Sequence, residues 1–283
     1  MLTIAASANV ERLRERLQHG LRELERQGVR VFSREQARGE YTYLSVGLQG
    51  FPARPEGAAI WQDVLRRQLA VVLCEVIVSD FRELLLRRIV TSRYPQLGTS
   101  ERETVVAYAQ RYLREEGAEE ALRRGVLLRL LDYMRDSPQL IVEGFITFRL
   151  KEYVEQLEDA VERAIDEILL EREYQEFVRL LQGFVAAQEP RLAEVHLLCR
   201  EDGLVLEDAE RRPLCLRVAA GVRAHLRSED LVVSGLVSLS PGRVVIHGSP
   251  ATDDDRAIVD AVVRIFAHRV ITCPGCPRCS PRT

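Results

Sequence analysis

The longest regular pattern in this sequence runs from Leu150 to Phe184, and it is helical. Apolar side chains recur at spacings of three and four, and acidic residues fall between them. The apolar series is Leu150, Val154, Leu157, Val161, Ile165, Ile168, Phe177, Leu181 and Phe184, and Pro190 ends it. A stripe of this kind usually packs against the helix's own domain, and we expect that here. A coiled-coil surface that binds a partner protein is the alternative.

Helical patterns extend over residues 56–190 and place helices at the centre of the fold. The motif Ser100-x-x-Glu103 matches a capping box and predicts the start of a helix that continues to Leu113. Another helix is expected over 118–133. Pro52 and Pro55 interrupt the sequence before this region, so we place a domain boundary there.

Residues 1–55 predict a small α/β unit. A short strand at Leu2 and Ile4 precedes a helix over 11–27, whose single apolar stripe is suited to covering one face of a sheet. Residues 42–48 then alternate with the period of two that is typical of a half-buried strand.

Residues 191–283 predict a second mixed unit. Two strands flank the turn Asp202-Gly203 and are expected to pair antiparallel. A helix beginning at Ser228, a strand over 244–246 and a helix capped by Thr252 follow. The expected fold class is therefore α+β, with a mainly helical central region (56–190) flanked by small mixed α/β units at residues 1–55 and 191–283.

Charge and hydropathy exclude several classes of protein. The formal net charge is −3, which gives no overall attraction to nucleic acid or anionic lipid. The longest apolar run, 69–78, contains Glu75 and is far shorter than the roughly 20 residues of a membrane-spanning helix. The first residues lack the charged segment of a signal peptide. We therefore expect a cytoplasmic protein without a membrane span, whose cysteines are reduced.

The most specific chemical signal is the run Cys273-Pro-Gly-Cys276-Pro-Arg-Cys279. Thiolates at this spacing bind zinc or an iron–sulfur cluster, but either group needs a fourth ligand. In the ferredoxin spacing the fourth ligand would be a cysteine four residues after Cys279, but that position is Thr283. A metal would therefore have to be completed by another chain or by a distant residue of this one, for which the candidates are Cys199, Cys215, His247 and His268.

Two other interpretations of this tail stay open. Neighbouring thiols could form a reversible disulfide and act as a redox sensor, helped by the positive charges of Arg269 and Arg278. The tail could also be a frayed terminus whose cysteines do little. The sequence alone does not decide among metal binding, redox chemistry and a passive tail.

Catalytic signatures are missing from this sequence. No nucleophile elbow, phosphate-binding glycine loop, dinucleotide fingerprint or zinc-protease motif occurs. His196 is expected to be a satisfied structural residue on a strand, and His247, at a strand end, is better placed for a site. Asp253, Asp254 and Asp255 are explained by capping of the last helix. A hydrolase or transferase with a cleft near the two histidines is the weakest alternative.

Several segments, taken in order, resemble the YtxC-like family of sporulation proteins. They are Val142-Glu-Gly-Phe-Ile-Thr-Phe-Arg-Leu-Lys-Glu-Tyr153, Glu173-Tyr-Gln-Glu-Phe177, Leu180-Leu-Gln-Gly-Phe-Val185, Val244-Val-Ile-His247 and the terminal cysteine run. The resemblance covers roughly residues 60–283 and is weak over the first unit.

The resemblance implies a cytoplasmic protein of endospore-forming bacteria with a link to sporulation. It transfers no catalytic mechanism to any residue. The sequence therefore predicts a non-catalytic protein that acts through contacts with other proteins and not with nucleic acid. A metal-binding or thiol redox-sensing module built on Cys273, Cys276 and Cys279 is the alternative, and the two functions are compatible. The oligomeric state is left open.

Overall fold

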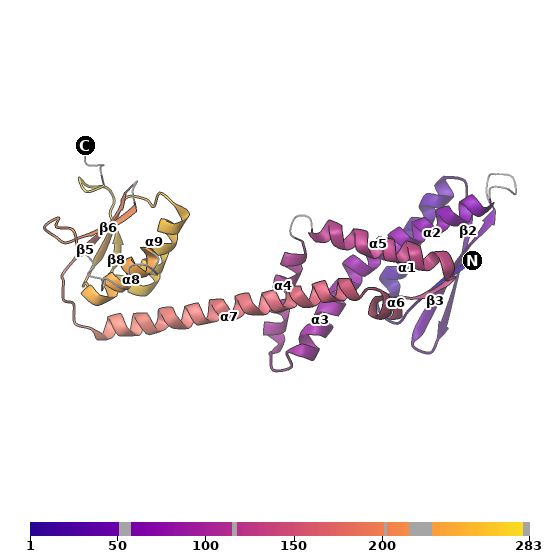
Figure 1. The fold of residues 1–283 in the computed structure, drawn as a ribbon, viewed down its shortest axis with the longest axis horizontal. Helices are drawn as coiled ribbons and strands as arrows, with labels where there is room; N and C mark the ends of the chain where they lie inside the picture. Colours follow the sequence, from indigo (N-terminus) through magenta and orange to yellow (C-terminus); the bar gives the residue numbers. More distant parts are fainter. Residues whose placement is uncertain (51–57, 115–117, 201–202, 215–227, 280–283) are drawn as a thin grey trace. The chain divides into compact units, whose positions relative to one another are not determined.

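The computed structural model describes residues 1–50, 58–114, 118–200, 203–214 and 228–279. Its residues form two compact units, an amino-terminal unit (Met1–Ile168) and a carboxyl-terminal unit (Leu169–Thr283) (Figure 1). Each unit combines helices with one four-stranded mixed sheet. The predicted α+β class with a mainly helical centre is confirmed.

The amino-terminal sheet has the strand order β2-β3-β1-β4. Its first three strands, β1 (Leu2–Ala6), β2 (Arg30–Arg38) and β3 (Tyr41–Gly50), come from the start of the chain and pair antiparallel, and β3 contains the alternating residues 42–48. The fourth, β4 (Gln139–Ile141), lies parallel to β1, with Leu140 opposite Ile4. A segment from the middle of the chain therefore completes this sheet.

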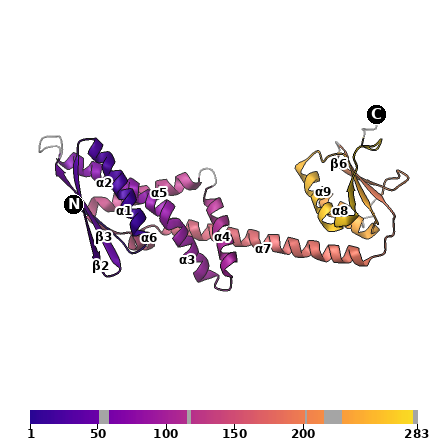
Figure 2. The ribbon, with the colours of Figure 1, turned by 180° about the vertical axis from the view of Figure 1, so that it is seen from behind.

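Helices of the amino-terminal unit share one hydrophobic core with the sheet. They are α1 (Val10–Arg26), α2 (Ala58–Glu75), α3 (Arg82–Arg93), α4 (Thr99–Leu113), α5 (Ala118–Asp136) and α6 (Val142–Arg149), with a π-helical segment η2 (Val76–Phe81) between α2 and α3. The stripe of α1, from Leu13 to Leu24, is buried, and α1 lies along the sheet beside α2 (Figure 2). The predicted role of this helix as a cover for the sheet follows from that burial.

The boundaries of the two units differ from the three segments expected from the sequence. The core of the amino-terminal unit runs from Leu2 to Ala164, so residues 1–55 and most of 56–190 are packed into one body. The long helix α7 (Lys151–Ala187) contributes to both cores, with Leu157 in the first and Val185 in the second. The first strands, α1, β4 and the central helices share this one hydrophobic core. A boundary near residue 55 therefore does not divide two separate cores.

One predicted helix start is wrong. Helix α4 begins at Thr99, and the backbone N–H of Gly98 donates to the Glu101 carboxylate at 2.7 Å. The capping glutamate therefore lies two residues before the expected Glu103, which instead pairs with Arg87 of α3. The chain enters this helix earlier because Glu101 satisfies a free backbone donor at its first turn.

A buried carboxylate ties α1 to the π-helical segment. The Asp80 side chain is 4% exposed, and the guanidinium group of Arg16 contacts it at 2.6 Å, with Arg12 at 3.4 Å. Tyr153 of α7 donates its hydroxyl hydrogen to the carbonyl of Ile77 in the same segment at 3.3 Å. The π-helical turn is therefore held from two sides by polar contacts.

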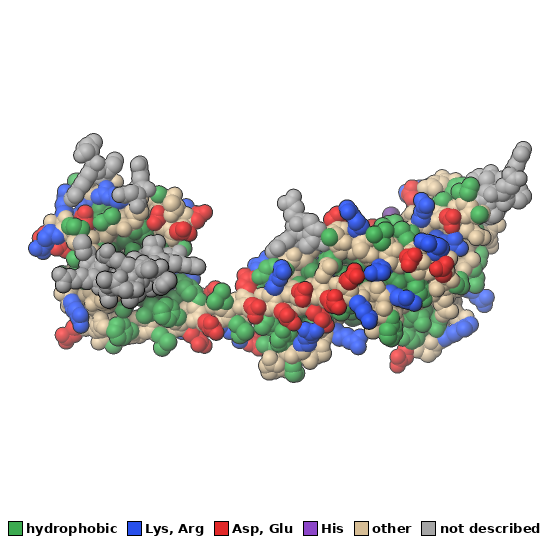
Figure 3. All heavy atoms as spheres, in the orientation of Figure 1, with side chains coloured by type: hydrophobic (Ala, Val, Ile, Leu, Met, Phe, Trp, Pro, Cys, Tyr) green, Lys and Arg blue, Asp and Glu red, His purple; other side chains and the backbone are tan. Residues whose placement is uncertain are grey.

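Charged side chains of both signs are intermixed over the amino-terminal unit in the view of Figure 3. Many form ion pairs between helices, as Arg93 of α3 does with Glu158 and Glu162 of α7. The helices that the structure describes include none that is both long and apolar enough to cross a membrane.

The carboxyl-terminal sheet has the strand order β6-β5-β7-β8. Strands β5 (Val195–Arg200) and β6 (Gly203–Glu207) form the predicted antiparallel hairpin, and β7 (Val244–His247) and β8 (Val270–Thr272) continue the sheet parallel to β5. The carboxyl ends of β5, β7 and β8 therefore lie at the same edge.

Two helices cover this sheet. Helices α8 (Ser228–Leu239) and α9 (Asp253–Phe266), followed by the turn η3 (Ala267–Arg269), pack Leu236, Val262 and Phe266 into the second core. The Thr252 hydroxyl accepts a hydrogen bond from the backbone of Asp255 at 3.1 Å, so the predicted cap of α9 is present. Helix α9 returns the chain from β7 to β8 and thus determines where the cysteine run begins.

Candidate metal centre

The site is built at the carboxyl ends of two parallel strands. His247 is the last residue of β7, and Cys273 directly follows β8. The backbone N–H of Cys273 donates to the carbonyl of Ile246 at 2.8 Å, which extends the pairing of β7 and β8 by one residue. The sheet therefore places the first cysteine beside the histidine.

A tight turn brings the other two cysteines back toward His247. Gly275 has a φ of +127°, a conformation that side chains with a Cβ rarely adopt. The N–H of Cys279 then donates to the carbonyl of Cys276 at 2.9 Å, and the N–H of Arg278 donates to the Cys276 Sγ at 3.3 Å. Proline and glycine between the cysteines thus produce a compact knuckle.

Four potential ligand atoms converge at this point. The side-chain ligand atoms of His247, Cys273, Cys276 and Cys279 all lie within 4.8 Å of one another. The Sγ atoms of Cys276 and Cys279 are 3.9 Å apart, and they lie 3.4 Å and 3.5 Å from the Nδ1 of His247. A tetrahedral zinc ion with ordinary bond lengths would separate two sulfurs by about 3.8 Å and a sulfur from a nitrogen by about 3.6 Å.

The electrostatic surroundings favour the ligating forms of His247 and Cys276. Burial lowers the pKa of His247, and the nearby His196 and Arg278 act in the same direction. The hydrogen bond from the Arg278 backbone is the largest cause that lowers the pKa of Cys276. A neutral imidazole and a thiolate are the forms that bind metal ions. The pKa of Cys273 is instead raised, because the lowering effect of a hydrogen bond from the backbone of Gly275 is outweighed by burial and by the neighbouring thiols of Cys276 and Cys279.

Arg278 fixes the knuckle to the neighbouring hairpin. Its guanidinium group donates to the backbone carbonyls of Asp208 and Ala209 at 3.1 Å and 2.6 Å and lies 3.4 Å from the carboxylate of Glu207. The sequence predicts Arg278 only as a positive charge near the thiols. The position of Arg278 between two cysteines does not predict these contacts, because they depend on how the cysteine run packs against the end of β6.

The sequence model of the YtxC-like family matches residues 67–271. The chain belongs to the YtxC-like family. This confirms the resemblance seen in the sequence. The uncharacterized protein YtxC of Bacillus subtilis (strain 168) is 30% identical over 139 residues, which make up 47% of this chain and 48% of that relative. The chain thus spans about half the length of the curated relative that it matches. No solved structure matches it.

The matched region of this YtxC-like chain contains His247 but ends before Cys273. Membership of the family therefore bears on the fold and on the strand that carries the histidine. It does not bear on the cysteine run, so the case for a metal rests on the geometry of the four side chains.

Of the four candidates for a fourth ligand, the structure places His247 beside the sulfurs. Cys199 is half-buried on β5, where burial raises its pKa, and His268 lies exposed in η3. Neither belongs to the cluster found among the described residues, and Cys215 lies outside them. The position of His247 at a strand end was the available signal for its role.

His196 lies directly behind His247 in the YtxC-like chain. Its Nδ1 is 2.9 Å from the Nε2 of His247, and its own Nε2 is 3.1 Å from a carboxylate oxygen of Glu194. Both imidazoles are buried. The expectation that His196 is a hydrogen-bonded residue of a strand agrees with these contacts, but the sequence did not show that its partner is His247.

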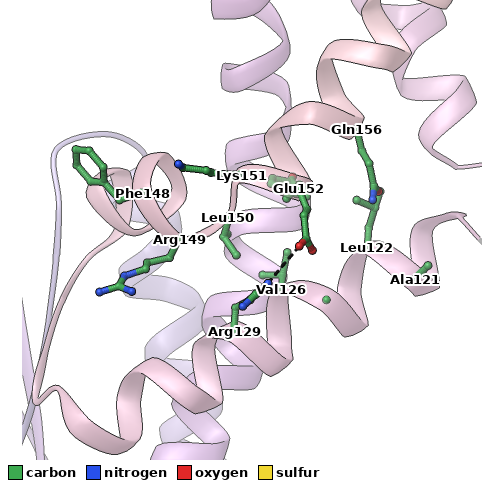
Figure 4. A pocket seen from close by; sticks show the side chains of 12 residues that line it. Ala121, Leu122, Val126, Arg129, Phe148, Arg149, Leu150, Lys151, Glu152 and Gln156 are labelled. Carbon is green, nitrogen blue, oxygen red and sulfur yellow. Dashed lines mark hydrogen bonds and ion pairs between the residues drawn. The ribbon is translucent and has the colours of Figure 1, made fainter.

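Hollows lined by described residues also lie away from this site, and two of them lie beside α7. One, of about 370 Å³, is lined by residues of α5, α6 and α7, and Arg129 there pairs with Glu152 at 3.2 Å (Figure 4). The other, of about 900 Å³, lies between α7, α8 and α9 and is mainly apolar. Among the lining residues that the structure describes, neither hollow has a group of metal-ligating side chains. Among the described residues of this YtxC-like chain, the group of side chains that could hold a metal ion lies at the knuckle.

Proposed function

We propose that this chain is a zinc-binding, non-catalytic protein that acts through contacts with other proteins in the cytoplasm of sporulating bacteria. The observation that carries the zinc proposal is the convergence of one imidazole nitrogen and three thiol sulfurs within 4.8 Å. Three sulfurs and one nitrogen are a donor set typical of structural zinc sites.

The spacing of the donors supports zinc over an iron–sulfur cluster. Cluster ligands bind different iron atoms, so the cluster's own atoms separate them. Here Cys276, Cys279 and His247 are spaced as the corners of a tetrahedron around one ion. An iron–sulfur cluster would require the knuckle to open.

A closed set of four ligands also supports the absence of catalysis. Catalytic zinc sites keep one coordination position for water or substrate, whereas structural sites use four protein ligands. In this site the zinc would tie the knuckle to the end of β7 and so stabilise the carboxyl-terminal unit as a surface for other proteins. The sporulation context is what the family resemblance implies, and the cytoplasmic location is supported by the cysteines, which are free among the described residues.

The metal content of the purified protein tests this proposal. The chain is purified anaerobically, and zinc and iron are measured per chain in the wild type, in the triple variant Cys273→Ser, Cys276→Ser, Cys279→Ser, and in Cys199→Ser as the matched control. We expect about one zinc in the wild type and the control and none in the triple variant. A wild type without zinc would overturn the proposal. Bound iron together with visible absorbance would show that the site holds an iron–sulfur cluster and not zinc.

The biological part is tested in an endospore-forming host whose own family member has been deleted. Heat-resistant spores are counted after complementation with the wild-type gene, the triple serine variant or Cys199→Ser. We expect the wild type and the control to restore spore counts and the triple variant to fail. Normal counts in the deletion strain would contradict a role in sporulation without affecting the zinc proposal.

A further inference from the structure

We propose that His196 and Glu194 are positioning residues of the metal centre, which orient His247 so that its Nδ1 is the ligating atom. The proposal rests on the zinc site described above and deepens it. The observation behind it is a continuous series of contacts from the sulfurs through His247 and His196 to the Glu194 carboxylate. Neither His196 nor Glu194 touches the position of the ion.

The two nitrogens of His247 face different partners. Its Nδ1 is directed toward Cys276 and Cys279, at 3.4 Å and 3.5 Å, whereas its Nε2 lies 2.9 Å from the Nδ1 of His196. A metal ion binds the nitrogen that carries no hydrogen. If Nδ1 binds the ion, the hydrogen of the neutral ring is on Nε2, which then donates to His196.

This arrangement determines the hydrogen position on the second ring. The Nδ1 of His196 must accept from His247, so a neutral His196 carries its hydrogen on Nε2. That hydrogen points at the Glu194 carboxylate, 3.1 Å away. Every donor in the series then has an acceptor, and the reversed arrangement would leave the ion facing a protonated Nδ1.

The series is anchored on rigid structure. His196 is 6% exposed on β5 and His247 is 3% exposed on β7, and these adjacent strands are the two interior strands of the sheet. Glu194 directly precedes β5, and its other oxygen pairs with Arg243 at 3.5 Å. Such outer partners fix the ring of a metal-binding histidine, and their loss typically weakens metal binding by about 10- to 100-fold.

Substitutions at His196 test the inference through zinc affinity. Affinity is measured by competition with a chromophoric chelator for the wild type, His196→Phe, His196→Gln, and His268→Phe as the matched control on an exposed histidine. Phenylalanine keeps a ring but neither accepts nor donates, so we expect affinity to fall by about 10- to 100-fold. Glutamine can accept from His247 and donate to Glu194, and it should restore affinity to within a few-fold of the wild type.

A spectroscopic measurement keeps the inference testable even if His196→Phe does not fold. Long-range ¹H–¹⁵N correlation spectra of the zinc-loaded wild type report which ring nitrogen carries hydrogen. We expect hydrogen on Nε2 of both histidines and metal on Nδ1 of His247. Zinc on the Nε2 of His247, or unchanged affinity in His196→Phe, would overturn this inference alone. A wild type that binds no zinc would overturn the proposed function together with it.

Discussion

The Nδ1 atom of His247 lies 3.4 Å from the Sγ of Cys276, a residue 29 positions further along the chain. Replacing His247 with alanine removes the nitrogen donor and should strongly reduce zinc binding. The wild type at a zinc concentration 100 times its dissociation constant should gain about 2.7 kcal/mol of unfolding free energy, which the variant would lack. Thermal unfolding with and without zinc measures this difference.

The control for that experiment is His268→Ala, which removes an exposed imidazole of the same unit. It should respond to zinc as the wild type does. Equal responses of His247→Ala and the wild type would show that this histidine is not a ligand.

A backbone substitution tests the shape of the knuckle. Gly275 has a φ of +127°, and a Cβ added there would meet nothing within 4 Å, so Gly275→Ala changes backbone strain without creating a clash. We expect the zinc-loaded protein to lose about 1–3 kcal/mol of unfolding free energy. Gly183→Ala, in the helical interior of α7, is the matched control and should stabilise by about 0.5–1 kcal/mol. A neutral result at Gly275 would mean that the turn differs in the loaded state.

Oxidation distinguishes a zinc site from the thiol redox alternative. The Sγ atoms of Cys276 and Cys279 are 3.9 Å apart, so in the metal-free protein hydrogen peroxide should oxidise the two thiols to a disulfide and itself be reduced to water. Zinc should slow this reaction because thiolates that bind the metal ion are less available to react with peroxide. Mass spectrometry after alkylation measures the rate. Equal rates with and without zinc would favour a redox function over a metal site.

The buried carboxylate of Asp80 is expected to stabilise the amino-terminal unit. Asp80→Ala removes the partner of Arg16 and Arg12, both of which still reach water, so we expect a loss of about 2–3 kcal/mol in urea unfolding. Asp63→Ala breaks a pair with Arg66 in which the carboxylate is 64% exposed, and it should cost at most about 1 kcal/mol. Similar losses in both variants would contradict the structural role of Asp80.

Local patterns predicted most secondary structure, because hairpins and amphipathic helices depend on neighbouring residues. The pairing of β5 with β6 and the stripe of α1 are examples, while Asp202 of the predicted turn lies outside the described residues. The three-residue strand β4 could not be found this way, since its pairing with β1 joins Leu140 to Ile4 across most of the amino-terminal unit. For the same reason the sequence did not show that the first strands and the central helices share a core.

The site was predictable in part for a similar reason. The three cysteines are evident from their spacing, but the choice of His247 over Cys199 and His268 depends on β8 lying beside β7. That pairing is set by the packing of α9, and no local signal reports it. His196 could not be connected to the site before the order of β5 and β7 was known.

Helix α7 has buried side chains near both ends, such as Leu157 and Val185, whereas every residue from Leu169 to Phe177 is exposed. An isolated helix exchanges its amide hydrogens fastest at its ends, where it frays. In α7 each core buries side chains near one end, whereas no side chain from Leu169 to Phe177 is buried in either core. Deuterium should therefore exchange first with the amide hydrogens near the centre of this helix. If one unit unfolds, the half of α7 that packs in the other unit's core should stay helical.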